Sequence, residues 1–398
     1  MKQYIIPLIF IVLIGYSCNK KKGNFSTIET ISIDVRKMKP EMDLTYAIDT
    51  SYFEIIPLET NPDCLIANVK RIYLSNNKIV VYDELAKGAY IFNRDGSFHA
   101  KVRAIGQGPG EYPDYVNDIM VSNNYIGVLP PPFGIMLYDF DGKFVKKVSL
   151  DGSWGMNLFT FDDISYFLVN DWGRTDVGYY LLFKIDTKQN RVYSYLPYPK
   201  SDEENNRGWG LDKYYDLHDN NALIYFSTID TIFNLTPSGE ITPRYAIDIV
   251  YKKIPDNLKR GDGYKALQSS ITNGYYKGIV NIAETSRYLF LKIDRGNYVV
   301  YDKKEKVIKS IAGLHRIPSF FNLGIGGFFS VTQGDYILTY NTGLALFNDK
   351  KYLDNLITGK TRKNSNGINP FEKEYFKVLK NVKDEEDNPV VFILKAKN

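Results

Sequence analysis

The chain repeats one order of short strands and turns, and this repeat limits the fold more than any other feature. The two clearest copies cover residues 79–102 and 126–148. Each copy has two apolar strands, an Asp-Gly turn and a third strand. Matching positions lie about 46 residues apart, which is the length of one four-stranded blade of a β-propeller.

Strand signals continue along the rest of the chain as runs of β-branched and aromatic residues between Gly, Asn, Asp and Pro. Further copies cover residues 166–196, 222–249 and 288–311, and a sixth begins at 328 and resumes at 390–394. A length of 398 residues fits one large all-β domain. We therefore predict an all-β fold, a six-bladed β-propeller that covers residues 30–398.

Two polar stretches interrupt the blades, near residues 255–272 and 350–384. Apolar residues in the first recur at helical spacing, so we predict small helical insertions. The segment 30–35 is similar to the outer-strand sequence 245–249. We expect this segment to be the outermost strand of the last blade and to close the ring.

The N-terminus has the features of an export signal. Lys2 precedes an apolar run, Ile5–Ile14, that is too short for a spanning helix of about 20 residues. Small residues then lead into Cys18, as in the lipobox of a bacterial lipoprotein. This predicts a signal peptide over residues 1–17, acylation of Cys18 and a lipidated tether over 18–29. The alternative is an ordinary signal peptide with an incidental cysteine.

The residues behind Cys18 bear on location. Asn19 and the lysines that follow it favour an outer-membrane lipoprotein of the cell envelope that faces the periplasm rather than the medium. Cys64 is the other cysteine of the chain, so acylation of Cys18 leaves no pair for an intramolecular disulfide. The apolar neighbours of Cys64 predict a small buried packing residue.

The chain resembles the six-bladed β-propeller lipoproteins common in Bacteroidota and, more distantly, NHL-repeat propellers. The resemblance depends on Cys18, the opening phrase 56–60, the run 78–112 and the closing phrase 387–391. It implies a propeller fold and an envelope location. It does not imply a settled activity.

A glycine-rich segment lies between the two clearest copies of the repeat, with the residues Gly106, Gly108, Pro109 and Gly110. We expect it to cross from the outer strand of one blade to the central strand of the next. Glycine permits positive φ and close backbone approach, and Pro109 restricts Gly108 to extended conformations. The alternative is a nest of backbone N–H groups that binds an anion. The spacing matches neither common nucleotide-binding motif.

The sequence predicts no catalytic residue, no bound metal and no cofactor. His99, His218 and His315 are not at metal-ligand spacing, and only His218 with His315 is a pair that the fold could bring together. No nucleophile-elbow motif is present. Aspartates recur at equivalent blade positions, where we expect them to cap turns: Asp83, Asp139, Asp186 and Asp302. A divalent metal in the central channel is the alternative.

Aromatic and basic residues fall between the strand signals, where indole and phenyl faces can stack on sugars or anchor a protein. The candidate binding residues are Trp172, Arg174, Trp209, Arg207, Phe133 and Trp154. The alternative for each tryptophan is packing between blades. A formal charge of +4 gives no reason to expect a nucleic-acid partner.

These observations favour a lipid-anchored envelope propeller that acts as a non-catalytic module for binding an envelope protein or a glycan. Two alternatives stay open. One is a metal-dependent lyase or hydrolase that acts on glycans or lactones in the channel. The other is a scaffold subunit of an outer-membrane uptake complex.

Overall fold

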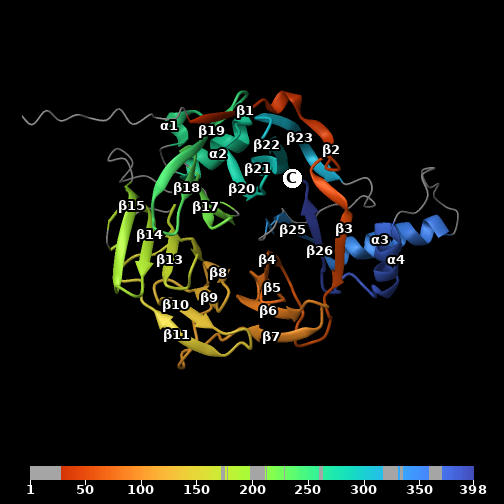
Figure 1. Cartoon of the computed structure of the whole chain (residues 1–398), viewed down its shortest axis with the longest axis horizontal. Helices are drawn as coiled ribbons and strands as arrows, with labels where there is room; N and C mark the ends of the chain where they lie inside the picture. Colours follow the sequence, from red (N-terminus) through yellow and green to blue (C-terminus); the bar gives the residue numbers. More distant parts are fainter. Residues whose placement is uncertain are drawn as a thin grey trace, which may run out of the picture.

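The computed structural model describes residues 28–171, 175–176, 178–197, 211, 213–227, 229–259, 263–316, 330–331, 335–357 and 370–398. Six sheets are arranged around a central axis (Figure 1). The six-bladed β-propeller predicted from the repeat is therefore confirmed. Cys18 and four of the candidate binding residues lie outside the described residues: Trp172, Arg174, Arg207 and Trp209.

Each blade has four antiparallel strands, of which the first lies nearest the axis. Blade 1 has β4 (Val69–Ser75), β5 (Lys78–Asp83), β6 (Gly88–Asn93) and β7 (Phe98–Val102). Blade 2 has β8 (Asp118–Val121), β9 (Ile126–Leu129), β10 (Ile135–Tyr138) and β11 (Phe144–Val148). Blade 3 has β12 (Asn157–Thr160), β13 (Ser165–Val169), β14 (Tyr180–Asp186) and β15 (Arg191–Pro197).

The N-terminal segment adds an outer strand to each of the other three blades. Blade 4 has β16 (Tyr215–His218), β17 (Asn221–Phe226), β18 (Ile229–Leu235), β19 (Ile241–Ile249) and β1 (Glu29–Ile33). Blade 5 has β20 (Ile279–Glu284), β21 (Tyr288–Ile293), β22 (Asn297–Asp302), β23 (Val307–Arg316) and β2 (Lys39–Asp43). Blade 6 has β24 (Ser330–Val331), β25 (Tyr336–Asn341), β26 (Val390–Ala396) and β3 (Ile48–Pro57).

The strand that closes the ring is β3, which pairs antiparallel with β26. The expectation for residues 30–35 is therefore wrong, because β1 pairs in parallel with β19 as a fifth strand of blade 4. Ile31 and Ile33 are buried there beside Ile247 and Ile249. The two segments are similar because both are outer strands with one buried face, and that pattern does not specify which blade a strand joins.

The second strands of blades 1 to 5 are buried along nearly their whole length, because the neighbouring blades cover them on both faces. In β9, Ile126, Val128 and Leu129 are each 0% exposed. Ile126 and Val128 pack with Val80 and Tyr82 of blade 1 in one buried cluster. Stacking of this kind puts the hydrophobic core between blades and fixes the inner strands around the channel.

The recurring aspartates hold the turns that follow them, as predicted, but their blade positions are not all equivalent. Asp83 ends the second strand of blade 1, whereas Asp139, Asp186 and Asp302 lie at the ends of third strands. Asp139 Oδ1 accepts hydrogen bonds from the backbone N–H groups of Asp141 (3.0 Å) and Lys143 (2.9 Å). Asp83, Asp186 and Asp302 also accept from backbone N–H groups two and three residues further on. Short polar side chains favour such local bonds at turns.

Helices form at both predicted insertions. α1 (Asp256–Lys259) and α2 (Gly263–Asn273) precede blade 5, and α3 (Gly343–Ile357) and α4 (Pro370–Asn381) connect β25 to β26. Figure 1 shows α3 and α4 outside blade 6, where Phe371 of α4 packs edge-on against Phe53 of β3. No helix in these ranges has both the length and the apolar composition needed to cross a membrane.

Candidate functional site

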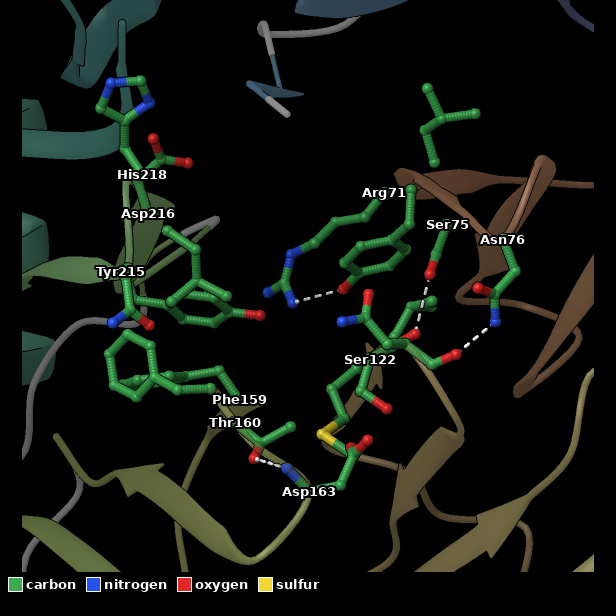
Figure 2. A pocket seen from close by; sticks show the side chains of 18 of the residues that line it. Arg71, Ser75, Asn76, Ser122, Phe159, Thr160, Asp163, Tyr215, Asp216 and His218 are labelled. Carbon is green, nitrogen blue, oxygen red and sulfur yellow. Dashed lines mark hydrogen bonds between the residues drawn. The ribbon is translucent and has the colours of Figure 1, made fainter. Parts of the chain in front are cut away.

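A cup of about 590 Å³ lies in the central channel. Its walls are the inner strands of blades 1 to 4 and the hairpin turns that lead from each inner strand to the second strand. In Figure 2, the side chains of Arg71 and Tyr215 point toward one another from opposite walls. The cup is therefore built from residues that are far apart in the sequence and that ring closure brings together.

A buried ion pair forms part of the floor. Arg71 of β4 lies 2.6 Å from Asp118 of β8, and the two residues are 7% and 0% exposed. Asp118 Oδ2 also accepts the backbone N–H of Leu158 in β12 at 2.9 Å. Burial raises the pKa of the Asp118 carboxyl, and Arg71 offsets this only in part. One carboxylate thus connects three blades.

Tyrosines extend this network across the channel. Tyr73 donates to the carbonyl of Ile119 at 2.6 Å, and Tyr215 donates to the carbonyl of Leu158 at 3.2 Å. The Arg71 guanidinium also donates to the Tyr73 hydroxyl at 3.3 Å and lies 5.9 Å from the centre of the Tyr215 ring. The floor is therefore a rigid, hydrogen-bonded layer.

A second buried pair lies on the wall that blade 4 provides. Lys213 is hydrogen-bonded to Asp216 of β16. Asp216 Oδ2 accepts the backbone N–H of Glu284 in β20 at 2.7 Å, which connects blade 4 to blade 5. Burial raises the pKa of the Asp216 carboxyl, against the opposing effect of Lys213. Both cations of the floor and this wall are thus already neutralised by the chain itself.

The rim consists of polar hairpins, and hydrogen bonds join the hairpins of neighbouring blades. Ser75 Oγ donates to the carbonyl of Ser122 at 2.9 Å, and Asn76 Nδ2 donates to the carbonyl of Asn123. These bonds tie blade 1 to blade 2. Asn124 Nδ2 donates to Asp163 Oδ2 at 2.8 Å and ties blade 2 to blade 3.

Backbone geometry explains only some of these rim residues. Asn76 and Asn77 have φ values of 50° and 56°, in the left-handed region that Asn tolerates well. Asn123, Asn124 and Asp162 have no such backbone requirement, because their φ values are not positive. Asp162 Oδ1 accepts the backbone N–H groups of Ile164 (2.9 Å) and Ser165 (2.8 Å) within its own turn, which leaves Oδ2 for another role. The Asn123 amide and the Asn124 Oδ1 also take no part in these rim bonds.

The three histidines do not converge. His99 lies on β7 and contacts Asp141 at 2.9 Å, and His315 lies on β23, the fourth strand from the axis. Of the histidine side chains that the structure describes, only His218 lines the cup, from the innermost strand of blade 4. The strands that contain His218 and His315 are therefore at different distances from the axis. Within the described residues, no group of three or more His, Cys, Asp or Glu side chains has the arrangement of a metal site.

Phe133 and Trp154 line a different hollow, a groove of about 710 Å³ between blades 2 and 3. Its walls are the β9–β10 loop and the β11–β12 connection, so it lies on the propeller face opposite the cup. Phe133 is 53% exposed. Thr175 and Asp176 complete the groove from the loop of blade 3 that also contains the candidate residue Trp172.

The glycine-rich segment connects β7 to β8, from the outer strand of blade 1 to the inner strand of blade 2. Glu111 folds back within it, and its carboxylate accepts the backbone N–H of Gly108 at 2.7 Å. A Cβ on Gly106 would lie 1.9 Å from that carboxylate. Gly110 has a φ of +80°. An internal carboxylate thus takes a bond that an anion in a nest would otherwise accept.

The sequence alone does not single out the residues of the cup, although the repeat contains a signal for them. Ser-Asn-Asn occurs at 75–77 and again at 122–124, at equivalent hairpins of neighbouring blades. By itself, this motif predicts only an ordinary turn. Only its position after an inner strand places it at the channel.

Fold and site together define a six-bladed β-propeller with a polar cup in its central channel. The chain belongs to the family described as a domain of unknown function, DUF4934, which matches residues 29–395. Among curated proteins no match is found.

Several solved structures are similar. One from Bacteroides fragilis, described as an exported protein, is 19% identical with a TM-score of 0.67, and covers 94% of this chain and 100% of its own. A DUF4221 member from Bacteroides vulgatus is 14% identical with a TM-score of 0.49, and covers 88% and 98%. A virginiamycin B lyase from Staphylococcus aureus is 12% identical with a TM-score of 0.39, and covers 74% and 83%.

Proposed function

We propose that this protein is a lipid-anchored propeller of the cell envelope that binds a saccharide in its central cup without transforming it. The observation that carries the proposal is the construction of the cup. Polar hairpins from several blades surround a cavity of about 590 Å³ above a floor of paired charges. Ligand sites are usually preformed concave cavities of this size with a few placed polar groups.

The side chains of the walls suit a hydroxyl-rich ligand. The Asn123 amide, Asn124 Oδ1 and Asp162 Oδ2 are left by the internal hydrogen bonds of the rim and can bond to sugar hydroxyls. Phe161 is half-buried on the same wall and packs edge-on against Phe167, with its ring centre 5.5 Å away. Aromatic faces of this kind provide apolar contact area for a sugar ring.

The test is titration calorimetry of the full chain in detergent with a panel of soluble oligosaccharides. Asn123→Ala and Phe161→Ala should each weaken the binding that is observed by about tenfold. Asn257→Ala is the matched control, because Asn257 is exposed on α1. Equal affinity in all three variants would show that the ligand does not occupy the cup.

The envelope location is proposed from the N-terminal sequence. Acylation of Cys18 would place the propeller at the outer membrane, and the basic tether favours the periplasmic side. Labelling with a radioactive fatty acid tests this directly. The native chain should incorporate the label, and Cys18→Ala should not. Equal incorporation in the two chains would refute the anchor.

The groove on the opposite face supports a second candidate function, contact with an envelope protein. The specific observation is that Phe133 and Trp154, both candidate binding residues, line one hollow. Exposed aromatic side chains are frequent anchors of protein interfaces. Phe133→Ala should reduce cross-linking to a partner in cells without lowering the thermal midpoint, whereas an unchanged cross-linking pattern would argue against this use of the groove.

A further inference from the structure

We infer that the ligand of the central cup carries a positively charged amine, as an amino sugar does, and that acidic saccharides are excluded. This inference rests on the proposed saccharide-binding function of the cup. It follows from the balance of charge among the described residues that line it. Three observations carry it: the cations are paired, the remaining charges are carboxylates, and buried polar atoms in the wall lack partners.

Each lysine or arginine that lines the described part of the cup already has a carboxylate partner. Arg71 is held by Asp118 at 2.6 Å, and Lys213 is held by Asp216. Arg94 at the rim forms two hydrogen bonds with Glu54, of 2.7 and 3.0 Å. No lysine or arginine of this part of the wall is thus left to pair with an acidic ligand.

Carboxylates remain after these pairs are formed. Asp162 and Asp163 line the cup from the hairpin of blade 3, and Asp219 lines it from the hairpin of blade 4. In the described residues, neither Asp162 nor Asp163 forms an ion pair, and Asp219 lies near only His218, at 3.2 Å. The rim therefore presents excess negative charge from two walls. Such a site attracts a cation and repels an anion.

Two side chains in these walls have buried polar atoms without a hydrogen-bond partner. Asp163 Oδ2 accepts from Asn124, but Asp163 Oδ1 has no partner. The side chain of His218 is 7% exposed, and both of its ring nitrogens lack a partner. The ring lies 3.2 Å from Asp219 and 3.7 Å from Asp335, and neither contact is aligned as a hydrogen bond. Buried polar groups are normally satisfied, so these atoms point to a ligand that completes them.

The chemistry needed is a charged donor on a hydroxyl-rich framework. An ammonium group has three N–H donors and no acceptor, which suits the carboxylates of Asp163 and Asp219. Sugar hydroxyls donate and accept, which suits the amides of Asn123 and Asn124. A simple anion would meet carboxylates on both walls. A neutral sugar would leave the excess charge of the rim uncompensated.

The experiment compares three trisaccharides of matched length with the full chain in detergent, by titration calorimetry at neutral pH and low salt. The probes are a glucosamine trimer (cationic), an N-acetylglucosamine trimer (neutral) and a galacturonate trimer (anionic). The glucosamine trimer should bind about tenfold more tightly than the neutral trimer, and its affinity should fall as salt is added. The galacturonate trimer should give no measurable heat.

Variants of the rim aspartates test whether the preference for the cationic trimer arises in the cup. Asp163→Asn and Asp219→Asn keep side chains that tolerate the positive φ of these positions, 60° and 46°. Each should weaken the glucosamine trimer by about tenfold and leave the neutral trimer unchanged. Asp176→Asn, in the groove on the opposite face, is the matched control and should change neither. The urea midpoint of each variant should match that of the native chain.

The possible outcomes separate this inference from the function beneath it. Equal binding of the neutral and cationic trimers, at a site sensitive to Asn123→Ala, would overturn the amine requirement and leave saccharide binding intact. Preference for the galacturonate trimer would overturn it as well. No measurable binding of any of the three trimers would overturn the inference together with the proposed function of the cup.

Discussion

Arg94, in the turn between β6 and β7, holds Glu54 of β3 through two hydrogen bonds of 2.7 and 3.0 Å. The pair crosses the seam at which the N-terminal strand β3 completes blade 6 and meets blade 1. Tyr52 donates a further hydrogen bond of 2.5 Å to the same carboxylate. Closure of the ring thus depends on a charged contact as well as on the backbone ladder between β3 and β26.

This contact predicts a pH-dependent stability. Burial disfavours the charged form of Glu54, but the hydrogen bonds from Arg94 and Tyr52 outweigh it and hold the pKa of Glu54 below its usual value. The folded state therefore binds this proton more weakly than the unfolded chain does. The stabilisation is complete above the unfolded pKa of about 4.3 and is lost as the pH falls through the lower folded pKa.

The measurement is urea unfolding of the native chain and of Glu54→Gln between pH 3 and pH 7. The native chain should be the more stable at neutral pH, and the difference should shrink as the solution is acidified. A difference that stays constant over this range would show that the charge of Glu54 does not contribute.

The buried pair of Arg71 and Asp118 should be costly to break. Arg71→Met leaves the Asp118 carboxylate buried without its cation, and this should lower the free energy of unfolding by about 3–5 kcal/mol. The double variant Arg71→Met with Asp118→Leu removes both charges and should recover part of that loss. A loss below about 1 kcal/mol in the single variant would mean that water reaches the floor of the cup.

A comparison of Gly110, in the blade-crossing segment, with Gly296, between β21 and β22, separates the cost of backbone strain from the cost of steric contact. Gly110 and Gly296 have similar φ values of +80° and +74°. A Cβ on Gly110 would lie 2.6 Å from the ring of Phe144, whereas nothing lies within 4 Å of a Cβ on Gly296. Gly296→Ala should cost about 1 kcal/mol, from the backbone alone. Gly110→Ala should cost about 1–3 kcal/mol more in chemical denaturation, because the ring must also move.

Equal losses for the two glycine variants would show that Phe144 adapts without cost and that glycine is needed at position 110 only for its backbone conformation. A loss confined to Gly296→Ala would show that Gly110 is needed neither for its positive φ nor for its close approach to Phe144.

The sequence could predict the blades because strand alternation and turn chemistry are local. Asp139 caps its turn through residues two and four positions away, so its role is readable without a structure. The partner of β1 is not readable in this way. The register of β1 on β19 depends on a contact between residues more than 200 positions apart, and any outer strand with one apolar face satisfies the same pattern.

The cup escaped prediction for a related reason. Asn123 looks like a loop residue in the sequence, and only the ring places it beside Asn76 and in one cup with Asp219. Indole and phenyl side chains drew attention instead because aromatic residues in loops are conspicuous. Phe133 and Trp154 do share a hollow, but on the other face of the propeller.

The side chain of Asn388, in the closing phrase 387–391, holds the connection between β3 and β4 in place through three hydrogen bonds. Its Oδ1 accepts the N–H of Ile66 at 2.9 Å, and its Nδ2 donates to the carbonyls of Glu59 and Cys64, each at 2.7 Å. The side chain is buried, so Asn388→Ala leaves backbone groups of the connection between β3 and β4 without partners. We expect a loss of about 2–3 kcal/mol in the free energy of unfolding.

The reactivity of Cys64, whose carbonyl accepts from Asn388, can measure whether this connection opens. Its thiol is fully buried, and burial raises its pKa, so it should react very slowly with a thiol reagent in the folded protein. In a Cys18→Ala background, where Cys64 is the remaining thiol, Asn388→Ala should accelerate labelling at least tenfold by opening the connection between β3 and β4. The exposed control Asn257→Ala should leave the labelling rate unchanged. Slow labelling in Asn388→Ala, with native stability, would mean that the backbone ladder between β3 and β26 closes the ring without help from this side chain.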